Sequence, residues 1–83
     1  MAHKSRELLQ QQLQRSNDVL VGGRYVHYKT KSVYIVEKLV VLEASDEVAV
    51  AYHDEIHPDI TWIRTYQDFV AKPDGQPRFS LLS

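Results

Sequence analysis

The residues of this 83-residue chain best suited to chemistry are aromatic and cationic side chains in separate short segments. Within each segment they stand at alternate positions, and alternate residues of a β-strand point to the same face of the sheet. Rows of this kind either pack into a core or line a groove that binds peptide, sugar or base rings. The candidates for ligand binding are Tyr25, His27, Lys29, Tyr52, Trp62 and Arg64.

We expect these residues to form one binding surface, with His27 and Arg64 lining a shallow pocket. Arg64 stands two residues after Trp62, so its guanidinium lies within cation–π reach of the indole. If Arg64 is buried, it needs a carboxylate partner such as Asp68 or Glu55. The alternative is that the aromatic rings are core residues whose hydroxyl groups have hydrogen-bond partners.

The segment His53-Asp54-Glu55-Ile56-His57 carries side chains of the types that bind metal ions. It differs from the zinc-protease helix signature, because Asp54 and not glutamate follows the first histidine. Pro58 also favours an extended backbone at His57, so the two imidazoles need not share a helix face. We therefore expect a solvated loop over residues 53–59 and no metal site.

Other catalytic motifs are missing from the sequence. The chain has no cysteine, which excludes thiol catalysis and zinc sites built on sulfur. Its serines lack a nucleophile-elbow context, and Gly22-Gly23 does not begin a phosphate-binding loop. An enzymatic hypothesis would rest on His27 with Arg64, or on residues 53–59. We expect a non-enzymatic module, without cofactor, that binds a peptide or a small polar ligand.

The net charge is only −1, but it is unevenly distributed. Residues 1–31 carry six cations against two carboxylates, a net +4, and residues 32–71 carry two against eight, a net −6. The two halves can therefore pair with each other or with a second copy. The low overall charge makes nucleic acid an unlikely partner. Arg24, Lys29 and Lys31, on one predicted hairpin, support nucleic-acid binding as the alternative function.

No apolar run is long enough to cross a bilayer, and the first five residues lack the apolar core of a signal peptide. We therefore expect a cytoplasmic protein that does not bind membranes, which the absence of cysteine also fits.

The spacing predicts a helix over residues 5–17. Ser5 is a good N-cap residue, Glu7 is favourable in the first turn, and Leu8, Leu9 and Leu13 share one side. A helix of about 12 residues is marginal alone in water, so we expect it to pack against another surface.

After a hinge at Gly22-Gly23 the pattern changes to that of strands, predicted over residues 24–29, 33–42, 48–52, 60–65 and 78–82. Glu37-Lys38 suggests a bulge, residues 66–69 a turn or one helical twist, and residues 72–75 a tight turn. In residues 48–52 valine and tyrosine alternate with alanine, so large and small side chains face opposite ways. The prediction is a mainly β fold: a small SH3-like barrel or roll of about five antiparallel strands (residues 23–83), preceded by one short helix and a hinge (residues 1–22).

Residues 39–42 are four consecutive apolar residues in a strand whose side chains alternate, so about half must point away from the core. The leucine stripe of the helix can cover this strip, which includes Leu39 and Val41, within its own chain. Alternatively it covers the strip of a second copy. We expect the second arrangement, a homodimer, because the two halves of the sequence have opposite charge.

Several short motifs, in order, resemble a known family. They are Arg24-Tyr25-Val26-His27-Tyr28-Lys29, Tyr34-Ile35-Val36, Val48-Ala49-Val50-Ala51-Tyr52, Trp62-Ile63-Arg64, Phe69 and Gln76-Pro77-Arg78-Phe79. Together they resemble the bacterial family called domain of unknown function 1653, over roughly three quarters of the chain. The resemblance implies an SH3-like β-roll and no known activity.

Overall fold

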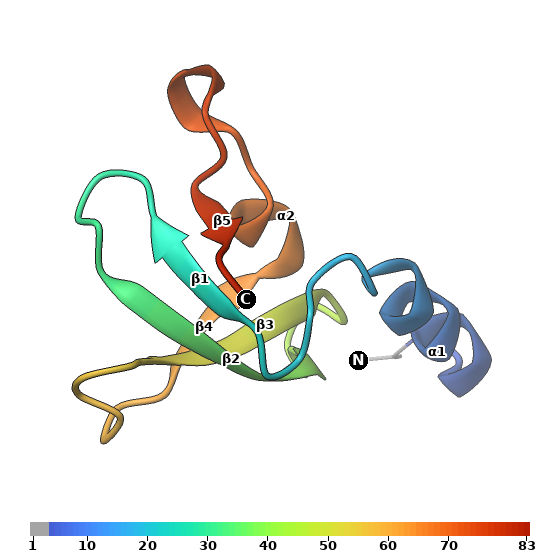
Figure 1. Cartoon of the computed structure of the whole chain (residues 1–83). Coiled ribbons are helices and arrows are strands. Elements are labelled where there is room, and N and C mark those ends of the chain that lie inside the picture. The colour runs from blue at the N-terminus through green and yellow to red at the C-terminus, as the bar shows by residue number, and fades with distance from the viewer. Residues whose placement is uncertain (1–3) are drawn as a thin grey trace.

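The computed structural model describes residues 4–83, and within them one antiparallel sheet is flanked by short helices (Figure 1). In chain order the elements are α1 (Arg6–Arg15), β1 (Arg24–His27), β2 (Val33–Val41), β3 (Val48–Asp54), β4 (Trp62–Thr65), α2 (Tyr66–Phe69), the 3-10 turn η1 (Pro73–Gly75) and β5 (Phe79–Leu81). The mainly β fold of five antiparallel strands behind a short helix is thus confirmed. No helix within residues 4–83 is long and apolar enough to span a membrane.

Helix α1 begins and ends where its capping residues predict. The Ser5 hydroxyl accepts a hydrogen bond from the backbone N–H of Leu8 at 3.2 Å, which satisfies one of the unpaired groups of the first turn. At the other end the Ser16 backbone N–H donates to the carbonyl of Leu13 at 3.2 Å. None of the residues of α1 is buried, and the helix contacts β2 and β3 of its own chain.

The strands lie in the order β4-β3-β2-β1-β5, which leaves β4 and β5 as the two edges. Between β2 and β3 the register shifts at Glu37: Val36 pairs with Tyr52, but Lys38 pairs with Ala51. The extra residue is a β-bulge, as predicted, and a bulge bends and twists its strand. It also allows Val36 and Leu39, three residues apart, to face the same side of the sheet.

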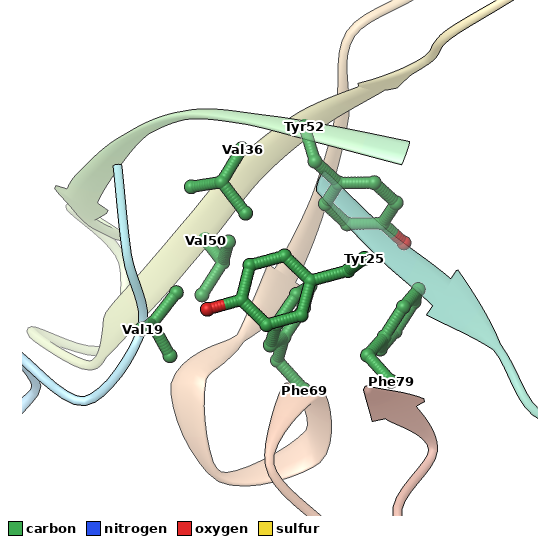
Figure 2. Packing of buried hydrophobic residues seen from close by; sticks show 7 residues of the cluster. All are labelled: Val19, Tyr25, Val36, Val50, Tyr52, Phe69 and Phe79. Carbon is green, nitrogen blue, oxygen red and sulfur yellow. The ribbon is translucent and has the colours of Figure 1, made fainter. Parts of the chain in front are cut away.

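The core lies on one face of this bent sheet (Figure 2). The rings of Phe69, from α2 after β4, and Phe79, from β5, stack with their centres 4.3 Å apart and 7° between their planes. The two rings come from opposite edges of the sheet. Their stacking therefore joins these edges, although the edge strands β4 and β5 are not hydrogen-bonded to each other. The buried cluster consists of Val19, Tyr25, Val36, Val50, Tyr52, Phe69 and Phe79. In β3 Val50 and Tyr52 belong to this cluster, and the alanines that alternate with them are buried on the other face, as predicted.

The segment predicted to be a hinge is fixed to β2. The N–H of Gly22 donates to the carbonyl of Val36 at 2.8 Å, and the N–H of Val36 donates to the carbonyl of Gly23 at 3.0 Å. Gly22 has a φ of +83°, which side chains other than glycine rarely adopt. Val19, just before this segment, is 4% exposed and belongs to the core.

Three strand ends differ from the prediction in ways that affect the site. Strand β3 continues through His53 and Asp54, which pair with residues of β2, so the predicted loop at 53–59 is shorter than expected. Strand β1 ends at His27, two residues early, because the carbonyl of His27 accepts from the N–H of Lys31 and the chain turns. Strand β4 likewise begins at Trp62 and not at residue 60.

Residues 39–42 are covered within their own chain, the first of the two arrangements that the sequence allowed. All four are half-buried, Leu39 packs against the core cluster, and α1 lies against β2 of the same chain. The homodimer through Leu8, Leu9, Leu13, Leu39 and Val41 stays a prediction.

Candidate functional site

The ring of Phe79 is the centre of the candidate site. Phe79 stands opposite His27 in the pairing of β5 with β1, and the two rings meet edge to face at 5.1 Å. From β4, the guanidinium carbon of Arg64 lies 5.8 Å from the centre of the same ring. His27 and Arg64, 37 positions apart in the chain, therefore contact one ring. We call His27, Tyr34, Tyr52, Trp62, Arg64, Arg78 and Phe79 the aromatic–cationic surface.

Arg64 is fixed by groups on two other elements. Its Nε–H points to the hydroxyl oxygen of Tyr52 at 3.4 Å, and its Nη1 donates to Asp68 Oδ2 at 2.9 Å. Partial burial opposes the charge, but these two partners outweigh it and raise the pKa of Arg64, so the group stays cationic. The carboxylate partner predicted from the sequence is thus Asp68. The ring beneath Arg64 is Phe79, and not Trp62 as expected, because Tyr52 and Asp68 hold the guanidinium there.

Arg78 completes the cationic group just before β5. Its Nε donates to the backbone carbonyl of Asp68 at 3.0 Å, and its Nη2 lies 3.6 Å from Asp68 Oδ1. Asp68 therefore bridges Arg64 and Arg78, which links β4, α2 and the start of β5. Both arginine side chains remain partly exposed.

His27 is held in a defined tautomer. Its Nδ1 accepts hydrogen bonds from the backbone N–H groups of Lys29 at 3.2 Å and Thr30 at 3.4 Å, so the neutral ring carries its proton on Nε2. Burial, followed by the positive charges of Arg64, Arg78 and Lys29, lowers the pKa of His27. The ring is therefore neutral at pH 7 in a positive local field.

Trp62 provides an exposed ring next to this group. It pairs with the buried Tyr52, so both share the core face of the sheet, yet 51% of its surface is exposed because β4 is an edge strand. Ile60 and Ile63 are exposed nearby on the same edge. Trp62 thus belongs to the surface and not to the core.

The other predicted site residues have different positions. Tyr25 is 6% exposed, its ring packs edge to face on Phe69, and its hydroxyl accepts from the N–H of Leu20 at 2.8 Å. It is therefore a core residue, not a ligand-binding residue. Tyr52 is equally buried and reaches the surface only through its hydroxyl. Lys29 lies in the turn after β1 and not on a strand face with His27, and its ammonium group is 5.7 Å from the centre of the Tyr28 ring.

The segment at residues 53–57 uses its polar groups within the fold. His53 Nδ1 and the Thr61 hydroxyl both lie 2.8 Å from Glu37 Oε2, so the bulge residue links β2, β3 and the chain before β4. Asp54 Oδ1 accepts from two backbone N–H groups of the following loop, at 2.8 and 3.1 Å. Among residues 4–83, no group of three or more histidine, aspartate or glutamate side chains is placed to hold a metal ion.

The basic hairpin is partly neutralised. Arg24 forms a two-pronged ion pair with Glu55, and this pair lies away from the turn that carries Lys29 and Lys31. The three cations do not form one continuous patch for a phosphate backbone.

Sequence reasoning named Asp68 as a possible partner of Arg64 but missed Arg78, Phe79 and Tyr34 as parts of the aromatic–cationic surface. Tyr34 meets Phe79 at 5.9 Å and Tyr52 at 5.3 Å between ring centres, both edge to face. Arg78 and Phe79 stood in the closing motif of the family resemblance, which was the available signal. Nothing local in the sequence places Asp68 between two arginines.

A separate open pocket of about 230 Å³ lies between α1, the start of β3 and α2. Lys4, Arg15, Glu47 and Tyr66 are among its lining residues, and none of the predicted site residues is.

Comparisons of this chain with models of known protein families, with curated proteins and with solved structures found no match.

Proposed function

We propose that this chain is a non-enzymatic binding module that recognises a peptide or a small polar ligand on the aromatic–cationic surface. The observation that carries the proposal is the half-exposed indole of Trp62 two residues from the partly exposed, fixed guanidinium of Arg64. Exposed aromatic rings beside a positioned cation supply both apolar contact and directional hydrogen bonds. Because the fold itself holds Arg64 and His27 in place, a ligand need not order them on binding.

Trp62 is the only tryptophan of the chain, so its fluorescence reports on this surface alone. We would screen short peptides and small polar molecules for a change in Trp62 emission. A true ligand should also shift the NMR resonances of His27 and Arg64. The matched control is Lys38→Gln, an exposed cation on the opposite face of the sheet, which should bind with unchanged affinity. Ligands that shift only residues around the α1–α2 pocket would contradict the proposal.

We also propose membership of the domain of unknown function 1653 family and an SH3-like roll. The motif residues that carried the resemblance include Tyr25, Val36, Tyr52, Phe69 and Phe79, all members of the buried cluster. These buried residues form a packing pattern, which supports a common fold. The same motifs also contain His27, Trp62, Arg64 and Arg78 of the aromatic–cationic surface.

A further inference from the structure

The two arginines of the aromatic–cationic surface have a spacing that fits a carboxylate. Arg64 and Arg78 each approach a different oxygen of Asp68, at 2.9 and 3.6 Å, so one carboxylate spans both guanidinium groups. Each guanidinium has five N–H donors, and the contacts to Asp68 and Tyr52 use only part of them. Both side chains are partly exposed, so further donors are accessible to a ligand.

His27 adds a neutral donor on the same side. Since its Nδ1 accepts from the backbone, its Nε2–H is the group available to an incoming acceptor. Arg64, Arg78 and Lys29 act on this ring, and their three positive charges exceed the one negative charge of Asp68 between the arginines, so the local field favours an anion.

We propose that the aromatic–cationic surface selects ligands that carry a carboxylate beside an apolar or aromatic group. The carboxylate binds the free donors of Arg64 and Arg78 with the Nε2–H of His27, and the apolar group packs on the exposed ring of Trp62. This inference rests on the proposed function and specifies its ligand class.

The arrangement fits a compact anion better than a nucleic-acid strand. A phosphate backbone needs cations spread along its path, whereas Arg64 and Arg78 converge on one carboxylate, that of Asp68. Arg24, which could extend the path, is paired with Glu55.

The test uses the full chain and a matched pair of probes, 3-phenylpropionate and its uncharged amide, 3-phenylpropanamide. Binding is followed by Trp62 emission and by NMR shifts of His27. The carboxylate should bind and the amide should bind at least about tenfold more weakly, the size expected for losing a charged hydrogen bond. Arg64→Gln should weaken carboxylate binding by about tenfold for the same reason. Lys38→Gln should not change it.

Asp68→Asn gives the most specific result. It removes the carboxylate that competes for both arginines while it keeps a side chain of similar shape, so the carboxylate probe should bind several-fold more tightly. A variant that merely folds badly would bind more weakly. If Asp68→Asn unfolds at the same denaturant concentration as the wild type, unchanged or weaker binding would show that the carboxylate does not use the donors that Asp68 occupies, and would overturn the inference.

Other outcomes separate this inference from the proposed function. Equal binding of the amide and the carboxylate would overturn the carboxylate class and leave the binding surface in place. Inorganic phosphate that binds as tightly as 3-phenylpropionate would show that the apolar group contributes nothing, which also overturns it. If neither probe changes any signal in the wild type or in Asp68→Asn, this inference fails, and the proposed function fails only if the screen of peptides and small polar molecules also finds no ligand. Salt-dependent binding of a single-stranded oligonucleotide on this surface, without probe binding, would favour nucleic acid instead.

Discussion

The side chains around Phe79 show how one residue's surroundings decide its role. His27, a binding candidate from the sequence, packs against the buried ring of Phe79, and its own partial burial, followed by the charges of three nearby cations, lowers its pKa. A histidine with a lowered pKa in the folded state binds fewer protons than in the unfolded state. Its neutral form therefore stabilises the fold above the unfolded pKa of about 6.5, and this stability is lost as the pH falls below that value.

Lys29→Gln should raise the pKa of His27, because it removes one of the three cations without touching a strand. The ring resonances of His27, followed by NMR against pH, measure this directly. Lys38→Gln, on the other face, is the control and should leave the His27 titration unchanged. An unchanged midpoint in Lys29→Gln would show that the positive field at His27 does not include Lys29.

Two aromatic residues should differ sharply when truncated. Phe69 is 2% exposed and stacks on Phe79, so Phe69→Ala should reduce the free energy of unfolding by about 3–5 kcal/mol. Trp62 is half exposed on an edge strand, and Trp62→Ala should cost only about 1 kcal/mol. Denaturant unfolding followed by circular dichroism compares both with the wild type. A loss near 3 kcal/mol for Trp62→Ala would mean that the indole is a core residue in solution.

At the scale of elements, the bulge residue Glu37 forms hydrogen bonds that connect β2 to β3 and to the chain before β4. The Glu37 carboxylate accepts from His53 and Thr61, and these hydrogen bonds, the one from His53 first, lower the pKa of Glu37. A carboxyl group with a lowered pKa stabilises the fold above its unfolded pKa, and that contribution is lost as the pH falls through the folded pKa. These hydrogen bonds thus hold the start of β4 most firmly at neutral pH.

Glu37→Gln should therefore lower the denaturation midpoint at neutral pH, and the difference from the wild type should shrink in acid. Denaturant titrations at several pH values below 7 measure the trend. Glu43→Gln, an exposed carboxylate with the same change of charge, is the matched control and should behave like the wild type. A constant difference at every pH would show that the effect of Glu37 is not its ionised carboxylate.

At the scale of the whole molecule, the segment before the sheet is part of the fold. Val19 lies in the core, and α1 contacts β2 and β3 of the same chain. A chain that starts at Gly22 should be less stable by at least about 1.5 kcal/mol from the loss of Val19 burial alone. It should also self-associate more than the full chain, because surface of β2 and β3 that α1 covers becomes exposed.

Sedimentation velocity at several concentrations compares the two chains, and full-length Val19→Ala separates the loss of the core residue from the loss of the helix. Val19→Ala should be less stable but should self-associate no more than the wild type. If instead the full chain is a dimer and the truncated chain a monomer, α1 is the dimer contact, as the sequence predicted.

The sequence by itself determined the features that depend on neighbours in the chain. The cap at Ser5, the bulge at Glu37 and the alternation of large and small residues in β3 were all predicted correctly, because each depends on local backbone geometry and on side-chain period. Only the tertiary structure decided which aromatic residues are buried. Tyr25 and Trp62 have similar local patterns, but β1 lies inside the sheet and β4 at its edge. Asp68 stands only four residues after Arg64 and was named from the sequence as a possible partner. Its second contact, with Arg78, depends on how α2 and β5 meet around the stacked rings of Phe69 and Phe79, which no local pattern indicates.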